Sequence, residues 1–233
     1  MQPIYLSGAA CAATLGGGLV ALWLKAERAR VIAFCSGALV AVAIMDLLPE
    51  ALKLVLSSPG VFELHHLFFS CSVGFFFSYV LERSQDHARA SAGFWGASGI
   101  GLHSFFDGFL IGQGFRAGDE IGWTVAFAVL LHKVTDGLSA VAVMLGTHQS
   151  FRAATIMLGA TALAPILGVA AQTKVTLATP ALGILLAFFS GILLYLGASH
   201  LLPEAREMDD SFWVPVMTLA GVAFISAVHL LSH

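Results

Sequence analysis

Eight long apolar segments, separated by short polar connections, constrain this chain more than any other feature of its sequence. They fall near residues 3–24, 31–56, 61–81, 92–115, 120–146, 152–171, 179–202 and 212–231. A helix needs about 20 apolar residues to cross a bilayer, whereas a membrane barrel would show short strands of alternating polarity. The sequence therefore predicts an all-α membrane protein, folded as a bundle of eight transmembrane helices.

The composition supports a membrane location and leaves no room for a separate soluble domain. The chain of 233 residues has 11 Lys and Arg, 14 Asp and Glu, 58% hydrophobic residues and a mean hydropathy of +0.88. In a typical soluble domain, roughly a quarter of all residues are charged. We therefore expect residues 1–233 to form a single transmembrane domain in the lipid bilayer, and the few basic residues argue against a nucleic-acid partner.

The basic residues also predict how the helices cross the membrane. Seven Lys and Arg lie in the odd-numbered connections and three in the even-numbered ones and their flanks. Because Lys and Arg concentrate on the cytoplasmic side, we expect a multi-pass protein of the cell inner membrane or plasma membrane with both termini outside the cytoplasm. The eleventh basic residue, Lys133, falls inside the fifth segment, where an ionisable group is costly enough to suggest a functional role.

A segment of the chain recurs at an offset of 154 residues. SGALVAVAIMDLLPEA begins at Ser36 and SGILLYLGASHLLPEA begins at Ser190, and Asp46 and His200 occupy equivalent positions. This repeat predicts pseudo-symmetric helices 1–3 and 6–8 around helices 4 and 5, a common construction in transporters, whose substrate site lies at the repeat interface. The alternative is that LLPEA only ends a helix at the membrane interface.

A second repeat, LHxxxDG, occurs once in the fourth segment and once in the fifth. His103 and Asp107 form the first pair, and His132 and Asp136 form the second. Residues four apart share one helix face, so two such helices facing one another bring two imidazoles and two carboxylates together. Metal sites in helix bundles are built in this way, although an isolated histidine in an apolar helix is more often hydrogen-bonded within the core. The glycine after each aspartate permits close helix approach.

At these motifs the sequence resembles the ZIP family of divalent-metal transporters, as a bacterial-type member with a variant metal site. The family usually has HNxPEG in span 4 and HExPEG or HExPHG in span 5, where this chain has HSFFDG and HKVTDG. The resemblance implies that His103, Asp107, His132 and Asp136 bind the metal. It also implies an elevator-like sliding of helices 1, 4, 5 and 6 against helices 2, 3, 7 and 8.

The same comparison adds candidate ligands outside the two paired motifs. Ser104, with one oxygen, replaces the family's asparagine, and span 2 is expected to contribute near Met45 or Asp46. Span 7 places His200 where relatives have an acidic or imidazole group. Glu50 and Glu204 close spans 2 and 7 beside a proline, as entry or exit ligands or as solvated helix-end carboxylates.

Lys133 stands where the family has a glutamate that helps to bind a second metal. A protonated lysine offers three donors and no acceptor, so we hypothesise that its ammonium group takes the place of the second metal and leaves a single-metal site. One alternative is that Lys133 points to another helix face, about 100° from His132. Another is that it carries a proton counter to the metal.

The predicted function is transport of a divalent transition metal, inward to the cytoplasm. Imidazole and carboxylate ligands suit zinc, the leading candidate, and also iron(II), manganese and cadmium. The metal is substrate rather than resident cofactor, a homodimer is compatible with this prediction, and we expect no enzymatic activity. The open alternatives are an intramembrane metal-dependent hydrolase and a metal-binding paralogue that does not transport.

Overall fold

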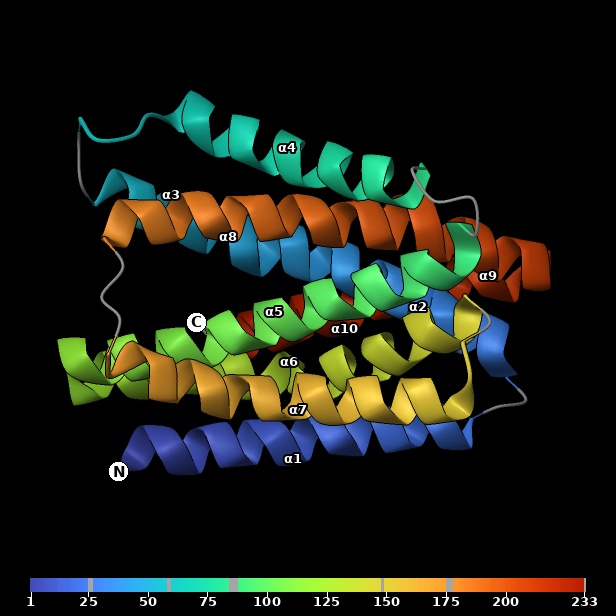
Figure 1. The fold of residues 1–233 in the computed structure, drawn as a ribbon, viewed down its shortest axis with the longest axis horizontal. Helices are drawn as coiled ribbons and strands as arrows, with labels where there is room; N and C mark the ends of the chain where they lie inside the picture. Colours follow the sequence, from blue (N-terminus) through green and yellow to red (C-terminus); the bar gives the residue numbers. More distant parts are fainter. Residues whose placement is uncertain (25–26, 58–59, 84–87, 148, 175–177, 233) are drawn as a thin grey trace.

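The structure, a computed structural model, describes residues 1–233 except 25–26, 58–59, 84–87, 148, 175–177 and 233. The described residues form helices and no strand, which confirms the predicted all-α fold. Eight long helical segments run side by side along the long axis of the molecule (Figure 1). Lys25, one of the seven basic residues counted for orientation, lies outside the described residues.

Six of these segments are single α-helices, and two contain a π-helical turn. The single helices are α1 (Gln2–Trp23), α4 (Leu64–Arg83), α5 (Ala88–Ala117), α6 (Asp119–Gly146), α7 (Phe151–Gln172) and α10 (Trp213–Ser232). The second segment consists of α2 (Arg28–Ala41), η2 (Val42–Leu47) and α3 (Leu48–Leu56). The seventh consists of α8 (Thr179–Leu194), η3 (Tyr195–Leu201) and α9 (Leu202–Met208). The predicted segments are confirmed to within a few residues, except that the seventh continues to Met208 instead of ending near 202.

A π-helical turn before the proline of each LLPEA motif explains how these helices continue. Pro49 and Pro203 each lie in the first turn of the α-helix that follows a π-helical turn. Proline lacks a backbone N–H and its ring clashes with the carbonyl four residues earlier in a regular α-helix. The wider π turn before each proline accommodates this clash, so the second helix continues through Pro49 and the seventh continues past the predicted end near 202.

Seven of the segments are long and apolar enough, by length and composition, to cross a membrane within the part of the chain that the structure describes. The exception is α5, which is rich in glycine, serine and other polar residues and carries His103 and Asp107. Its 30 residues are long enough to span a bilayer. His103 and Asp107 are both buried within the bundle.

The helices pack as two groups. One group, α1, α5, α6 and α7, forms the lower layers of Figure 1, and the other contains α2, α4, α8 and α10. These are the two sets of helices that the family resemblance implies. Both chain termini lie toward one end of the bundle, which we call the terminal end, and α9 lies at the opposite end (Figure 1).

Two glycines let α5 and α6 pack directly on the backbone of a neighbouring helix, with no side chain between them. A Cβ atom added at Gly108 of α5 would lie 1.9 Å from the carbonyl oxygen of Pro165 in α7. A Cβ atom added at Gly137 of α6 would lie 1.8 Å from the carbonyl oxygen of Thr14 in α1. The expected close approach after each aspartate is therefore confirmed, and α5 packs on α7 as α6 packs on α1.

Candidate metal centre

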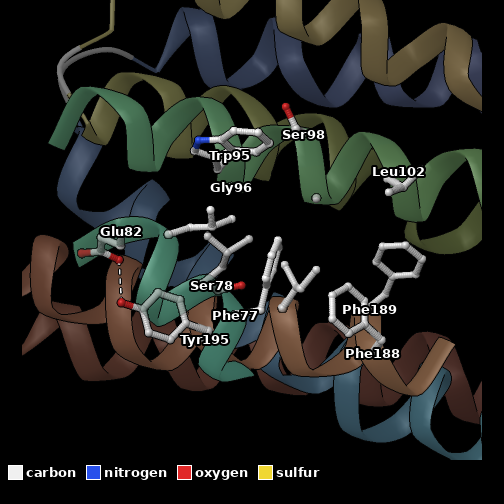
Figure 2. Close-up of a pocket in the computed structure, with 14 residues that line it drawn as sticks. Phe77, Ser78, Glu82, Trp95, Gly96, Ser98, Leu102, Phe188, Phe189 and Tyr195 are labelled. Carbon is white, nitrogen blue, oxygen red and sulfur yellow. Dashed lines mark hydrogen bonds between the residues drawn. The ribbon is translucent and has the colours of Figure 1, made fainter. Parts of the chain in front are cut away.

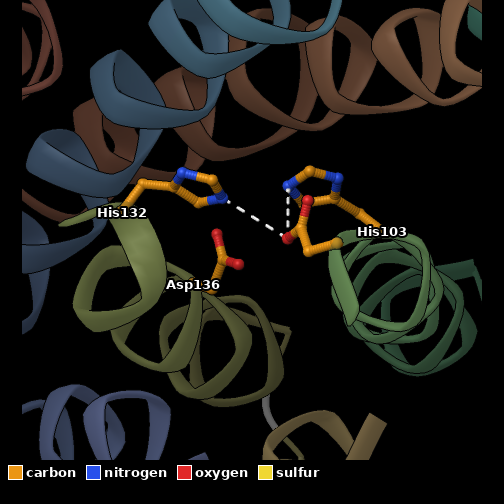
Figure 3. Close-up of side chains that lie close together, drawn as sticks. His103, His132 and Asp136 are labelled. Carbon is orange, nitrogen blue, oxygen red and sulfur yellow. Dashed lines mark hydrogen bonds and ion pairs between the residues drawn. The ribbon is translucent and has the colours of Figure 1, made fainter. Parts of the chain in front are cut away.

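The two LHxxxDG motifs converge in the interior of the bundle. His103 and Asp107 lie on α5, His132 and Asp136 lie on α6, and one ligand atom from each lies within 4.8 Å of the others. All four side chains are buried. Figure 3 shows His103 and His132 projecting from neighbouring helices into one space beside Asp136. Two imidazoles and two carboxylates therefore meet away from solvent, as the spacing predicts.

The two imidazoles lie almost parallel around the same carboxylate. Their ring centroids are 5.6 Å apart with an interplanar angle of 21°, and each Nε2 lies 3.4 Å from Asp107 Oδ2. Among the described residues, His103 Nδ1 has no hydrogen-bond partner, and His103 Nε2 has only the 3.4 Å contact with Asp107 and no hydrogen bond. A buried polar nitrogen without a partner calls for an explanation, and binding of a cation by its lone pair would supply one.

The ammonium group of Lys133 lies between the two carboxylates. Lys133 is fully buried, and its Nζ donates to Asp136 Oδ2 at 2.5 Å, to Asp107 Oδ2 and to Ser104 Oγ at 2.9 Å. The Ser104 hydroxyl also donates to Asp136 Oδ2 at 3.3 Å. Lys133 thus points to the same centre as His132 rather than to a different helix face.

The charges of this centre add to −1 when both histidines are neutral. Asp107 and Asp136 contribute −2, and the ammonium group of Lys133 contributes +1. Burying an unpaired charge costs free energy. Binding of one divalent cation would change the net charge of the centre to +1. The ammonium group uses Oδ2 of each carboxylate, so Oδ1 of each aspartate is not engaged by it.

A cavity of about 430 Å³ connects this centre with the terminal end of the bundle. It reaches His103, Asp107 and His132 at its deep end, and Glu50 and Glu120 also line it. Met45 and Asp46 of η2 line it too. Three of the residues proposed from the sequence outside the paired motifs, Met45, Asp46 and Glu50, therefore face the route to the buried centre.

Asp46 and Met45 both contact α10. His229 Nδ1 lies 2.9 Å from Asp46 Oδ1, and the Ser226 hydroxyl donates to Met45 Sδ at 3.3 Å. His229 lines the same cavity, and sequence reasoning assigned it no role. The only available signal was an ionisable residue inside the last apolar segment.

His200 lies apart from the four converging residues and pairs with Glu82 of α4. Its Nδ1 lies 3.5 Å from Glu82 Oε2, and the Tyr195 hydroxyl donates to the same oxygen at 2.7 Å. Glu82 was also missed from the sequence, where it reads as a helix-end charge beside Arg83. Glu204, on α9, does not belong to the buried group of four.

The pairs Asp46–His229 and His200–Glu82 are related by the internal repeat. Asp46 and His200 are separated by 154 residues, and Glu82 and His229 by 147. Gly37 and Gly191 are related by the repeat in the same way. A Cβ atom added at Gly37 would lie 1.9 Å from the carbonyl oxygen of Thr218 in α10, and one added at Gly191 would lie 1.9 Å from that of Cys71 in α4. The repeat thus extends from α2 and α8 to the helices that pack on them.

A second cavity, of about 340 Å³, lies between α4 and α8 on one side and α5 on the other (Figure 2). Phe77, Trp95, Leu102 and Phe189 are among its mostly apolar lining, with Glu82 at one end. This cavity separates the two helix groups over part of their contact. It contains none of the four converging ligands.

The fold and the buried centre together define a class: a polytopic membrane protein whose core brings together ligands suited to a divalent metal. A model of the ZIP zinc transporter family matches residues 82–229, more than half of the chain. The chain therefore belongs to the ZIP zinc transporter family, and the match includes both helices of the buried centre.

Two curated relatives agree with this assignment. The chain is 29% identical over 113 residues to zinc transporter zipt-7.1 of Caenorhabditis briggsae, covering 47% of this chain and 29% of that protein. It is 27% identical over 136 residues to human zinc transporter ZIP6, covering 57% of this chain and 18% of that protein. The chain thus spans less than a third of the length of these relatives.

Proposed function

We propose that this protein transports a divalent transition-metal ion, with zinc as the leading candidate, inward across a cell membrane. The observation that carries the proposal is the buried meeting of two imidazoles and two carboxylates with a net charge of −1. Such a centre attracts a cation strongly, because its charge is poorly solvated. Membership of the ZIP family and similarity to two zinc transporters support the same function.

The donor set favours zinc and chemically similar ions. Two imidazole nitrogens and two carboxylate oxygens suit zinc, iron(II), manganese and cadmium, whereas copper(I) prefers sulfur ligands. We propose that His103, Asp107, His132 and Asp136 bind the transported ion, with Ser104 beside them. The metal is then the substrate, and it must bind weakly enough to be released.

We further propose that the site holds one metal because Lys133 occupies the second position. Its ammonium group already neutralises part of both carboxylates through Oδ2. A second divalent ion in the same space would raise the net charge from +1 to +3, without another carboxylate in the group of four to compensate. Ser104 supplies only a neutral hydroxyl to that side of the centre.

The remaining candidates define a route through the bundle. In this proposal the ion enters from the terminal end along the cavity lined by Met45, Asp46 and Glu50. On the opposite side of the centre, His200 with Glu82, and then Glu204, would receive it. The distribution of Lys and Arg supports a cytoplasmic location for that opposite end, with both termini outside.

An elevator movement is the mechanism that the packing supports best. The buried centre lies entirely on α5 and α6, within the group of α1, α5, α6 and α7. The apolar cavity of Figure 2 lies at the boundary with the other group, where fewer contacts oppose sliding. Movement of one group would expose the intact site alternately to the two sides.

Uptake by purified protein in liposomes tests the transport proposal. Zinc-65 or a zinc-sensitive dye should report flux down an imposed gradient, and Asp136→Asn should abolish it while Asp119→Asn, at an exposed position, should not. Absence of flux for zinc, iron(II), manganese and cadmium would reject transport. Bound metal without flux would then favour the non-transporting paralogue or the hydrolase.

A further inference from the structure

In each π-helical turn, one backbone carbonyl accepts two hydrogen bonds. One comes from the N–H of the residue that follows the turn, and the other comes from a side chain of the other repeat. The N–H of Leu48 donates to Ala43 O, and the N–H of Leu202 donates to Gly197 O. The hydroxyl of Ser190 donates to the first of these carbonyls and that of Ser36 to the second, each at 3.0 Å.

These two hydroxyl bonds form a symmetric, crossed pair. The donors Ser36 and Ser190 differ by 154 residues, and the acceptors Ala43 and Gly197 differ by the same number. Each bond runs from the α-helix of one repeat to the π turn of the other, and both serines are buried. The same bond thus occurs twice, once for each repeat.

The turns that receive these bonds control where functional side chains point. A π turn contains one more residue than a regular turn, so its presence rotates the following side chains by about 100° relative to an uninterrupted α-helix. Met45 and Asp46 lie in η2 and line the cavity that reaches His103, and His200 lies in η3 against Glu82. Loss of the π turn would turn these side chains away.

The serines are held in place independently of their hydroxyl groups. Gly37 and Gly191, the residues after them, pack at backbone distance on α10 and α4. This packing fixes the rotation of α2 and α8, so each hydroxyl faces the opposite repeat. Removal of one hydroxyl should therefore weaken one π turn without moving its own helix.

We infer that Ser36 and Ser190 are positioning residues that act across the repeats. Ser190, in the seventh segment, sets the register of Met45 and Asp46 at the cavity on the terminal side. Ser36, in the second segment, sets the register of His200 at the opposite side. The inference depends on the proposed function only for its consequence in metal transport, since the positions of the side chains can be measured without metal.

Reporter cysteines test this crossed effect. The reporters are Met45→Cys in η2 and Ser199→Cys, an exposed position in η3 next to His200. Each is placed singly in a chain whose Cys11, Cys35 and Cys71 are replaced by alanine. Purified protein in nanodiscs is labelled with a water-soluble maleimide. Ser190→Ala should change the labelling rate of the first reporter by about two- to tenfold, as expected for the loss of one hydrogen bond. Ser36→Ala should change only the second reporter.

Two controls separate positioning from general loosening. Thr161→Val removes a buried hydroxyl that has no hydrogen-bond partner among the described residues, and it should change neither rate. Ser190→Thr keeps the donor and should preserve the native rate. Equal changes at both reporters with either alanine variant, or no change at either, would overturn the inference. Because labelling requires no flux, this result is independent of whether the protein transports metal.

Discussion

Lys133 is the residue that most distinguishes this centre, and its position follows from its place on α6. It lies three residues before Asp136, so the two share a helix face, and its long stem also reaches Asp107 and Ser104 on α5. The ammonium group thus links α5 and α6 through the carboxylates of Asp107 and Asp136. In the proposed function, it lowers the net negative charge that the centre presents to a metal ion.

Replacing Lys133 by glutamate should convert the proposed single-metal site into a site for two. Lys133→Glu changes the charge of the centre from −1 to −3, which two divalent ions would bring to +1. Equilibrium dialysis with elemental analysis should therefore find one zinc per chain in the native protein and two in the variant. Lys53→Glu, on an exposed side chain near the cavity, is the control and should leave one; two ions in the native protein would contradict the single-metal proposal.

Removing one carboxylate should weaken metal binding more than removing any neutral group nearby. Asp107 contacts Lys133 and both histidines, and Asp107→Asn leaves the centre with a net charge of zero. We expect zinc affinity, measured by isothermal titration calorimetry, to fall at least about tenfold, as is typical when metal coordination is disturbed. Ser104→Ala should have a smaller effect, and unchanged affinity in Asp107→Asn would remove this residue from the site.

The sequence predicted the centre as far as the residues share regular helices. His103 with Asp107, and His132 with Asp136, could be paired because a four-residue spacing fixes their direction on an α-helix. His229 and Glu82 could not be found in this way, because their partners Asp46 and His200 both lie in π turns. Their contacts depend on which helices meet, and no local spacing encodes that.

At the level of helices, glycine contacts decide which elements approach closely. Gly17 of α1 lies against α6, where an added Cβ would come within 1.9 Å of Val134 O. The adjacent Gly16 is exposed, with nothing within 4 Å of its added Cβ. The two neighbours therefore share one helix and differ only in the face that they occupy.

These neighbouring glycines give a matched test of the α1–α6 contact. Gly17→Ala should destabilise the protein, because a methyl group would push α1 away from α6, whereas Gly16→Ala should be neutral or gain about 1 kcal/mol from helix propensity. The midpoint of thermal unfolding in detergent measures both effects. An equal shift in the two variants would show that the contact contributes nothing to stability.

The helical segments themselves were predictable, but the turns within them were not. Long apolar runs between charged connections identified all eight segments, because spanning length and composition are strong signals. The seventh segment was expected to end near 202, beside Pro203, since proline disrupts a regular α-helix. The structure instead accommodates it after a π turn, a solution that also depends on the serine of the other repeat.

At the level of the whole molecule, the two helix groups meet along a boundary that a cross-link could bridge. Gly99 of α5 and Ile192 of α8 lie on opposite sides of it, and a Cβ added at Gly99 would be 3.0 Å from Ile192 Cγ2. Gly18 of α1 and Leu158 of α7 are similarly close, at 2.2 Å from the added Cβ to Cδ1, but both belong to one group. A cysteine pair at positions 99 and 192 would therefore link the two groups, whereas a pair at positions 18 and 158 would link two helices of the same group.

If the protein works as an elevator, only the link between groups should stop transport. In a chain without its native cysteines, oxidised Gly99→Cys/Ile192→Cys should lose zinc flux, because α5 could no longer slide past α8. It should still bind zinc, because the four proposed ligands on α5 and α6 are unchanged. Oxidised Gly18→Cys/Leu158→Cys should keep its flux, and a reductant should restore the first variant. Undiminished flux in the fully cross-linked first variant would exclude sliding at this boundary and require a mechanism in which the groups remain fixed.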